Sequence, residues 1–145
     1  MKSRIVIRKF RLSDYDAVLK LWDETGLHYR PKGRDSRERI EKEIKKKNAI
    51  FLIAEVDSKI VGTVLGTHDG RKGWLNRVAV VKKFRRQGIA RKLVTEAERR
   101  LDKLGFEVIA CLIEGDNTTS MKFFKQLGYE KSDVLYFSKR KTPES

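Results

Sequence analysis

The segment Arg85-Arg86-Gln87-Gly88-Ile89-Ala90 stands where an apolar strand pattern, residues 74–81, changes into an apolar helical pattern, residues 89–104. The first N–H groups of a helix have no partner inside the helix, and Gly88 lets a ligand approach them closely. Several basic side chains add to the positive end of the helix dipole: Lys82, Lys83, Arg85, Arg86 and Arg91. Such a turn could bind a pyrophosphate. The alternative interpretation is a basic turn that is exposed to solvent and binds no ligand.

Composition narrows the class of protein. The 145 residues, 39% hydrophobic and 37% charged, fit one soluble globular domain. No apolar run reaches the roughly 18–20 residues of a membrane span, and residues 1–7 lack the pattern of a signal peptide. We therefore expect a cytoplasmic protein without a membrane partner. The single cysteine, Cys111, excludes an internal disulfide and is expected in the core.

The net charge of +14, from 34 Lys and Arg against 20 Asp and Glu, would attract polyanions such as nucleic acid. The basic residues are spread over several expected elements and alternate with acids except around the turn. No helix-turn-helix, zinc-finger or RNP pattern accompanies them. Nucleic-acid binding is therefore the least favoured function, because dispersed charge is typical of a solvated surface.

The chain alternates strand and helix patterns without internal repeats. The expected elements are, in order, a strand over residues 5–7, a helix capped by Ser13, a polar helix capped by Asp35, strands over 50–56, 60–67 and 74–81, the helix 89–104, a strand over 107–113, a short helix through Met121, Phe124 and Leu127, and a terminal strand over 134–138. The helix 89–104 is long enough to make its flanking strands parallel, whereas short turns join the earlier strands as an antiparallel meander.

The predicted fold class is therefore α/β (α+β), with one mixed central sheet flanked by about four helices. The sheet combines an antiparallel N-terminal meander with a parallel pair at the basic turn. We expect residues 1–141 to form the domain and residues 142–145 a frayed tail. The loop 27–33 contains His28 and Tyr29, residue types that recognise ligands, although a plain surface loop is the alternative.

Two motifs lie on either side of the helix 89–104. The first is Arg85-x-x-Gly88-x-Ala90, preceded by Val78-Ala79-Val80. The second is Asn117 followed by Phe123-Phe124-Lys125-Gln126-Leu127-Gly128-Tyr129. With the order of elements, they resemble the GNAT superfamily of acyl-CoA-dependent N-acyltransferases, whose turn reads Q/R-x-x-G-x-G/A. The resemblance covers nearly the whole chain and implies a single GNAT-like domain with a CoA-pyrophosphate turn.

The resemblance also implies how acetyl-CoA, the acetyl donor, is bound. The strand before the turn would contact the pantetheine arm in a gap between two splayed parallel strands, and the amides of residues 86–91 would hold the pyrophosphate. Asn117 matches a family asparagine that contacts the cofactor, but it would also make a good helix cap. The expected cofactor-binding residues are Val78, Ala79, Val80, Arg85, Arg86, Gln87, Gly88, Ile89, Ala90, Arg91, Asn117 and Phe124.

The reaction implied is direct attack of a primary amine on the acetyl thioester. Many family members have an acid where this chain has Asn76 and a tyrosine where it has Phe124, so the usual base and acid are absent. Candidate catalytic residues are Glu114, Tyr129 and Tyr136. The alternative for Glu114 is a solvated turn residue, and the alternative for the two tyrosines is a place in the packed core. The expected substrate-binding residues are His28, Tyr29 and Asn76.

Two functions stay open at this point. One is an N-acetyltransferase for an amine of an unidentified small molecule, peptide or protein; the other is an acyl-CoA-binding or interaction module whose catalysis has decayed. No metal site is expected, because His28, His68 and Cys111 are isolated in the sequence. Exposed edge strands in such folds allow a homodimer.

Overall fold

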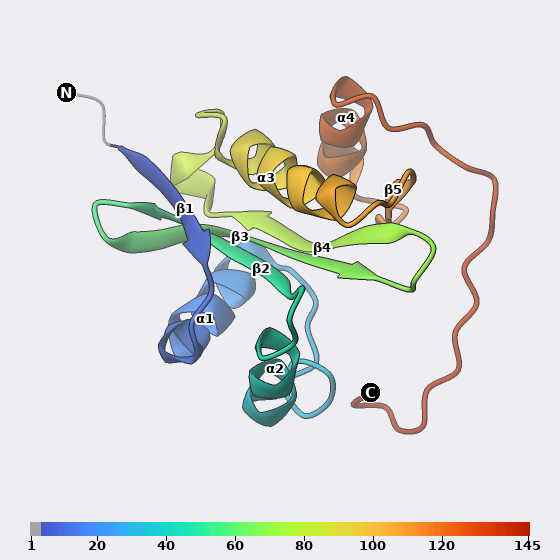
Figure 1. Cartoon of the computed structure of the whole chain (residues 1–145). Helices are drawn as coiled ribbons and strands as arrows, with labels where there is room; N and C mark the ends of the chain where they lie inside the picture. Colours follow the sequence, from blue (N-terminus) through green and yellow to red (C-terminus); the bar gives the residue numbers. More distant parts are fainter. Residues whose placement is uncertain (1–3) are drawn as a thin grey trace.

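Five strands pair in their sequence order, β1-β2-β3-β4-β5, to form one sheet with helices on both faces (Figure 1). The computed structural model describes residues 4–145. The elements are β1 (Ile5–Lys9), α1 (Tyr15–Thr25), α2 (Arg37–Ile44), β2 (Ile50–Val56), β3 (Lys59–His68), β4 (Gly73–Val80), α3 (Ile89–Lys103), β5 (Ile109–Cys111) and α4 (Thr118–Gln126), with short 3-10 turns η1 (Leu12–Asp14) and η2 (Lys82–Phe84). The predicted mixed sheet and the number of helices are confirmed for the described residues.

The sheet is antiparallel from β1 to β4 and parallel between β4 and β5. The parallel pairing is short, running from Gly73 opposite Ile109 to Leu75 opposite Cys111. Beyond Leu75, β4 therefore pairs with β3 on one side and with no described strand on the other. This open edge lies where the resemblance to the superfamily implies a gap between the two strands, and binding of the pantetheine arm there stays a prediction.

The two faces of the sheet have separate cores. On one face α3 buries an apolar stripe of Ile89, Leu93, Val94, Ala97 and Leu101, each at most 1% exposed, because these residues recur every three or four positions. On the other face α1 and α2 pack through side chains that include Trp22 and Ile40. Figure 1 shows α3 and α4 on one side of the sheet and α1 and α2 on the other.

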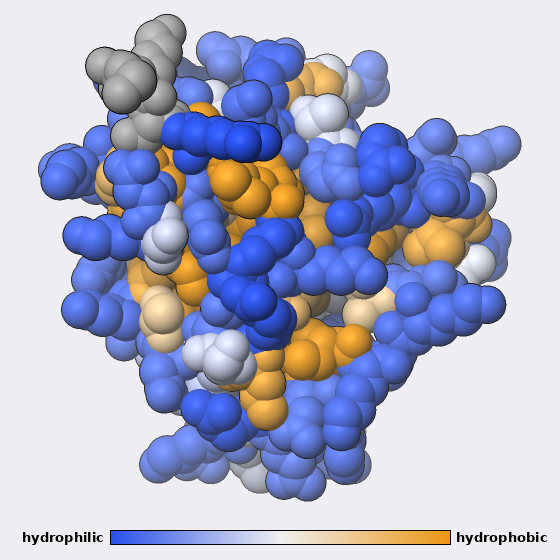
Figure 2. All heavy atoms as spheres, turned by 60° about the vertical axis from the view of Figure 1, so that its left-hand side comes forward, coloured by the Kyte–Doolittle hydropathy of each residue, from blue (hydrophilic) through white to orange (hydrophobic). Residues whose placement is uncertain are grey.

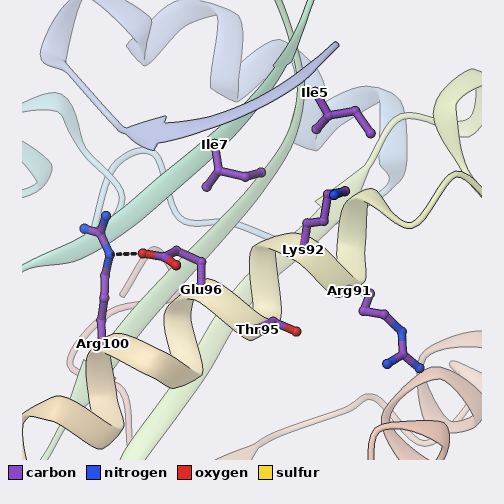
Figure 3. A pocket seen from close by; sticks show the side chains of 7 residues that line it. All are labelled: Ile5, Ile7, Arg91, Lys92, Thr95, Glu96 and Arg100. Carbon is purple, nitrogen blue, oxygen red and sulfur yellow. Dashed lines mark hydrogen bonds and ion pairs between the residues drawn. The ribbon is translucent and has the colours of Figure 1, made fainter. Parts of the chain in front are cut away.

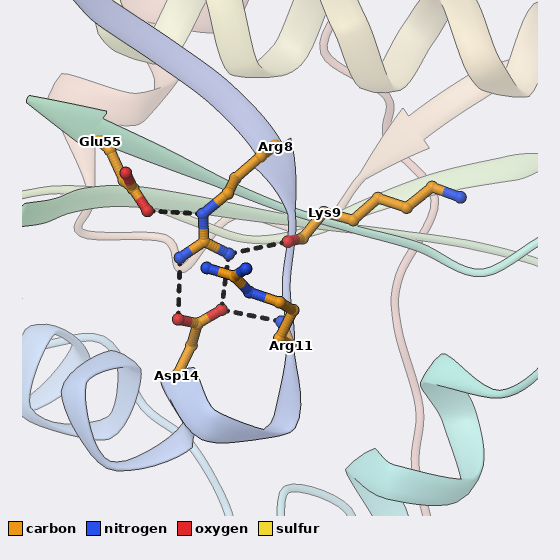
Figure 4. A network of polar contacts seen from close by, with 5 residues as sticks. All are labelled: Arg8, Lys9, Arg11, Asp14 and Glu55. Carbon is orange, nitrogen blue, oxygen red and sulfur yellow. Dashed lines mark hydrogen bonds and ion pairs between the residues drawn. The ribbon is translucent and has the colours of Figure 1, made fainter. Parts of the chain in front are cut away.

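An ion-pair network joins the turn η1 to strands β1 and β2 (Figure 4). The Arg8 guanidinium on β1 donates to both oxygens of Asp14, at 2.8 and 2.9 Å, and to Glu55 on β2 at 2.5 Å. The Asp14 carboxylate also accepts a hydrogen bond of 2.8 Å from the Arg11 amide. The pKa of Asp14 lies below its usual value, and the hydrogen bond from Arg8 is the main cause.

Both expected helix caps are wrong. Helix α1 begins at Tyr15, after a 3-10 turn, and Ser13 caps nothing in the described structure. Helix α2 is capped by Ser36, whose Oγ accepts from the Arg39 amide at 3.3 Å, rather than by Asp35. Serine and aspartate cap equally well, so the local pattern fitted more than one helix start.

A β-bulge interrupts β4 and turns one side chain toward the α1 and α2 face. Thr63 pairs with Ala79 and Leu65 pairs with Asn76, so two β4 residues lie opposite one β3 residue. The first of the two, Arg77, has φ +54°. The bulge thus begins where the pairing with β5 has ended.

The expected terminal strand over residues 134–138 is wrong. Residues 129–140 form neither helix nor strand, and every residue from 130 to 144 is exposed. In Figure 1 the segment leaves α4 and runs outside the sheet to the C-terminus. The apolar pattern is real, but a strand requires a neighbour, and none of the strands within residues 4–145 pairs with it. Tyr136 is accordingly 66% exposed instead of lying in the core.

The C-terminal residues return to the loop between α1 and α2. The Arg30 guanidinium donates to the Pro143 carbonyl at 3.5 Å, and the Glu144 carbonyl closely approaches the Gly33 backbone. The Ser145 amide donates to the Thr142 carbonyl at 3.1 Å, which closes a turn. Fraying of residues 142–145 stays a prediction.

The surface on the β1 side is mostly hydrophilic, with separate apolar patches (Figure 2). A shallow groove runs there between β1 and α3, floored by Ile5 and Ile7 (Figure 3). Its α3 wall includes Lys92 and Glu96, and Glu96 accepts a hydrogen bond of 2.9 Å from Arg100. Figure 3 shows Arg91, on the same helix, pointing away from β1.

Candidate active site

The turn between β4 and α3 is built from two residues with left-handed backbone. Gly88 precedes α3 with φ +77°, and Arg86 has φ +64°. Apart from its neighbours in the chain, no heavy atom lies within 4 Å of the position that a Cβ of Gly88 would take, so the turn faces open space. The Arg85 Nε donates to the Val80 carbonyl at 3.0 Å and joins the end of the strand to the turn. The predicted strand-turn-helix arrangement is confirmed.

The turn presents a row of free backbone donors. The first intrahelical bond of α3 runs from the Lys92 amide to the Gly88 carbonyl at 3.0 Å. The amides of residues 86–91 have no hydrogen-bond partner in the described chain. Five exposed basic side chains stand around them: Lys82, Lys83, Arg85, Arg86 and Arg91. Unpaired amides, a helix N-terminus and positive charge together form an anion site of the kind that holds a pyrophosphate.

The strand that leads into this turn lies beside the gap in the sheet. Val78 is half-buried, and Ala79 and Val80 are each 7% exposed. Their backbone runs from the bulge to the turn with β3 on one side only. An extended ligand anchored at the turn would therefore meet strand backbone on this open side.

On the opposite face, the bulge positions a buried ion pair. The Arg77 Nη2 donates to the Asp35 carboxylate at 2.6 Å, with side chains 14% and 5% exposed. The same carboxylate accepts the Arg30 amide at 2.6 Å, and the Tyr15 hydroxyl donates to the Asp35 carbonyl at 2.8 Å. The Arg77 Nε is buried without a hydrogen-bond partner in the described chain. The loop between α1 and α2 is thus held directly against the bulge of β4.

Residues 15–129 match the model of the acetyltransferase (GNAT) family, well over half of the chain. The chain belongs to the GNAT acetyltransferase family. The resemblance drawn from the two motifs is confirmed.

Solved structures share the fold of this GNAT chain. An aminoglycoside N-acetyltransferase, AAC(6')-Iy, in complex with CoA superposes with a TM-score of 0.79 at 19% identity, over 98% of both chains. The PaiA N-acetyltransferase from Thermoplasma acidophilum, in complex with coenzyme A, gives 0.80 at 21% identity, over 91% of this chain and 93% of that one. Ard1 from Thermoplasma volcanium gives 0.76 at 19% identity, over 88% of this chain and 84% of that one. At these identities the likeness establishes the fold alone.

Two positions where this GNAT chain departs from common family residues have structural partners. The Asn76 Nδ2 donates to Thr67 Oγ1 at 3.0 Å, which orients the amide across the strand pair. Phe124 is 5% exposed and packs edge-on against Tyr129, with ring centroids 5.1 Å apart. Phe124 is thus mainly a core residue, and its contact with the cofactor stays a prediction.

The three catalytic candidates lie in different surroundings. Glu114 is exposed in the turn after β5, which agrees with the alternative that it is a solvated turn residue. The Tyr129 hydroxyl donates to Glu98 on α3 at 2.7 Å, and burial is the main reason that its pKa is raised above the usual range. Tyr136 lies on the exposed C-terminal segment. The structure therefore does not bring the three side chains together.

The remaining expected residues are placed as follows. Asn117 caps α4 by accepting the Ser120 amide at 3.1 Å, so its capping role is confirmed and its cofactor contact stays a prediction. His28 is exposed. The Tyr29 hydroxyl donates to Asp23 at 2.7 Å, and this bond raises the pKa of Tyr29 to about 12. Cys111 is half-buried, and burial raises its pKa to about 11.

The residues that sequence reasoning missed lie on the α1 and α2 face. Besides Arg77 and Asp35 they include Thr63, which accepts the Trp22 indole N–H at 3.0 Å and donates to the Arg77 carbonyl at 2.7 Å. Burial raises the pKa of Glu43, and the charges of Asp35 and Arg77 act on it. Asp35 lies in a polar stretch just before α2, so the sequence pattern offered it only as a helix cap.

None of the helices within residues 4–145 is long and apolar enough to span a membrane. The same residues contain no group of three or more His, Cys, Asp or Glu side chains that could hold a metal ion.

Proposed function

We propose that this GNAT protein is an N-acetyltransferase that transfers the acetyl group of acetyl-CoA to a primary amine. The observation that carries the proposal is the turn 85–90, where unpaired amides, a 15-residue helix and exposed basic side chains converge beside an open strand edge. CoA-bound structures of the same fold support acetyl-CoA as the donor. A basic turn in plain solvent would need no neighbouring gap in the sheet.

In this proposal the donor lies along β4. The amides of residues 86–91 hold the pyrophosphate, and Lys82, Lys83 and Arg91 supply charge around it. The pantetheine arm runs in the opening beyond Leu75, against the backbone of residues 78–80. The thioester would then lie near the bulge, where β4 changes direction.

The acceptor would approach from the loop between α1 and α2. That loop is anchored to the bulge by the Arg77 and Asp35 pair, and Asn76 precedes Arg77 on β4. His28 and Tyr29 belong to the same loop and are proposed as acceptor contacts. The name of one similar structure, an aminoglycoside N-acetyltransferase, supports including amine-bearing small molecules among the acceptors to be tested.

The reaction is a direct displacement. The amine nitrogen attacks the thioester carbonyl carbon, the C–N bond forms as the C–S bond breaks, and CoA leaves as a thiolate. The proton released by the amine passes to water, because Asn76 has no carboxylate and the Tyr129 hydroxyl is bonded to Glu98. A thiol with a pKa near 8.5 can leave as its thiolate without a positioned acid, at a moderate cost in activation free energy.

A binding module with decayed catalysis is the second candidate, favoured by the buried Phe124 and by the Asn76 amide that is tied to Thr67. Both functions require binding of acetyl-CoA, but only the enzyme releases thiol when an acceptor is present. The distinction therefore rests on turnover rather than on affinity.

The test is thiol release from acetyl-CoA with a panel of α-amines, lysine-type amines, polyamines, amino sugars and peptides, at several pH values. An enzyme without a positioned base should show a rate that rises about tenfold per pH unit below the pKa of the acceptor amine. Acetyl-CoA binding without acceptor-dependent thiol release across the panel would leave the module as the function. Failure to bind acetyl-CoA would overturn both.

A further inference from the structure

The loop between α1 and α2, residues 26–36, carries positive charge that nothing in the described chain neutralises. Arg30, Lys32 and Arg34 are its basic residues, and Asp35 is its only acid. Lys32 and Arg34 are exposed, and their side chains make no hydrogen bond or ion pair within residues 4–145. The Arg30 guanidinium meets only the Pro143 carbonyl, at 3.5 Å. Three cations of one loop are thus available to a ligand.

The acids around this loop do not offset its charge, because they are already engaged or buried. The Asp35 carboxylate accepts the Arg77 guanidinium at 2.6 Å, and its side chain is only 5% exposed. On α1, the Asp23 carboxylate accepts the Tyr29 hydroxyl at 2.7 Å. On α2, burial raises the pKa of Glu43 and so disfavours its charged form. The loop is therefore prepared for an anion and not for a second cation.

The cations belong to a turn of defined shape. The Gly33 and Asp35 amides donate to the Arg30 carbonyl at 3.0 and 2.9 Å, and the Ser36 amide donates to the Gly33 carbonyl at 3.1 Å. The Arg30 amide donates to the Asp35 carboxylate at 2.6 Å, and the same carboxylate holds the turn against the bulge of β4. The backbone that carries the three cations is thus ordered before a ligand arrives, which lowers the free-energy cost of binding.

A positive acceptor loop discriminates among amines. An acceptor whose only charged group is an ammonium is repelled by these cations, whereas a carboxylate beside the amine is attracted by them. Lysine and arginine both donate charge-assisted hydrogen bonds to a carboxylate. We propose that the acceptor is a primary amine with a carboxylate close to it, and that Lys32 and Arg34 bind this carboxylate. The inference rests on the proposed acetyl transfer and names the chemical class of its acceptor.

Three amidated tetrapeptides test this preference: Ala-Asp-Asp-Phe, Ala-Asn-Asn-Phe and Ala-Arg-Arg-Phe. They share one α-amine, and at about pH 9 this amine, with a pKa of about 7.7–8.0, is mostly neutral in each peptide. We expect kcat/KM for thiol release from acetyl-CoA to be about tenfold higher for the Asp peptide than for the Asn peptide, and lowest for the Arg peptide. The preference should shrink in about 0.5 M salt, because salt screens exposed charges. Equal values for the three peptides, or a preference for the Arg peptide, would overturn the inference and leave the acetyl transfer in place.

Two double variants test the residues. Lys32→Gln with Arg34→Gln should bring the Asp and Asn peptides to nearly equal kcat/KM through a raised KM for the Asp peptide. Lys32→Glu with Arg34→Glu should reverse the order in favour of the Arg peptide. Arg71→Gln with Lys72→Gln is the matched control and should keep the preference, because it removes the same two charges from the exposed turn between β3 and β4. An unchanged preference in both loop variants would overturn the assignment to Lys32 and Arg34.

The source of the carboxylate is distinguished with single-residue acceptors, the α-amides of aspartate and asparagine. A preference for the aspartate amide shows that a small molecule is sufficient. A preference that is confined to the tetrapeptides indicates the terminus of an acidic chain. No preference in either set overturns the inference.

A binding measurement separates failure of this inference from failure of the proposed function. If no acceptor releases thiol, the proposed acetyl transfer is wrong, and the loop is then tested without turnover. The same tetrapeptides, with a fluorophore at the C-terminus, are titrated in the presence of CoA and followed by fluorescence anisotropy. Tighter binding of the Asp peptide than of the Asn peptide, lost in Lys32→Gln with Arg34→Gln, supports the loop as a carboxylate site. Equal binding of the two peptides overturns it.

Discussion

The guanidinium of Arg77 lies 2.6 Å from the carboxylate of Asp35, and this pair joins the bulge of β4 to the loop between α1 and α2. Both side chains are largely buried, at 14% and 5% exposed. In a GNAT acetyltransferase the two segments would flank the thioester and the acceptor. The position of the loop between α1 and α2, where we propose that the acceptor binds, is therefore fixed by a residue of β4.

Asp35→Asn should destabilise the protein strongly, because it leaves the Arg77 guanidinium buried without its counter-charge. Loss of one partner from a buried pair costs about 3–5 kcal/mol in the free energy of unfolding. Unfolding in urea measures this change in the free energy of unfolding. Asp16→Asn is the control, since Asp16 meets Arg37 at 3.5 Å with the two side chains 90% and 51% exposed. It should cost no more than about 1 kcal/mol. Equal small effects in the two variants would contradict a structural role for the pair.

Gly88→Val should abolish acetyl-CoA binding, since the β-branched side chain enters the open space in front of the amides 86–91. Gly88 also has φ +77°, so valine strains the turn as well. Gly105→Val is the matched control, with φ +96° and open space at the far end of α3. Thermal shifts with and without acetyl-CoA separate the two effects. Both variants should lose stability, but Gly105→Val alone should still be stabilised by acetyl-CoA.

Stability should fall at acidic pH in part through Asp14. The hydrogen bond from Arg8 lowers the pKa of this carboxyl in the folded protein. The ion pair therefore contributes fully above the unfolded pKa of about 3.9, and its contribution disappears as the pH falls through the lower folded value. Asp14→Asn should reduce stability at neutral pH and flatten its decline below about pH 4. Glu38→Gln, at an exposed pair with Lys42, is the control and should leave the dependence of stability on pH unchanged. Identical pH dependence in Asp14→Asn and the wild type would refute the role of Asp14.

Tyr129→Phe should affect stability more than catalysis. The Tyr129 hydroxyl donates to Glu98 at 2.7 Å, and a hydrogen bond to a charged group contributes about 1.5–3 kcal/mol. Unfolding in urea and kcat for thiol release are the two measurements. A large drop in kcat with an altered pH profile and little change in stability would instead identify Tyr129 as the acid that protonates the leaving thiolate.

The sequence predicted the parts of the fold that local signals determine. Gly88 and the apolar stripe of α3 fixed the turn and the helix, and the length of α3 fixed the parallel pairing of β4 with β5. The bulge at Arg77 escaped prediction because it arises from the register between β3 and β4. Asp35 was interpreted as a cap because its partner lies 42 positions away in the sequence.

The C-terminal segment shows a different limit. Residues 134–138 have the composition of a strand, but composition cannot supply the neighbour that a strand requires. Tyr136 was expected in the core for the same reason and is exposed. The departure of Asn76 and Phe124 from common family residues was visible in the sequence, whereas their partners, Thr67 and Tyr129, became visible only in the fold.

We propose that the turn 85–90 binds the pyrophosphate of acetyl-CoA, and calorimetric titration of two acetyl thioesters tests this binding. Acetyl-CoA contains the pyrophosphate, and S-acetylpantetheine presents the same thioester and arm without it. We expect the wild type to bind acetyl-CoA far more tightly than S-acetylpantetheine, and Gly88→Val to remove that difference. Equal affinity of the wild type for the two ligands would contradict binding of the pyrophosphate at this turn.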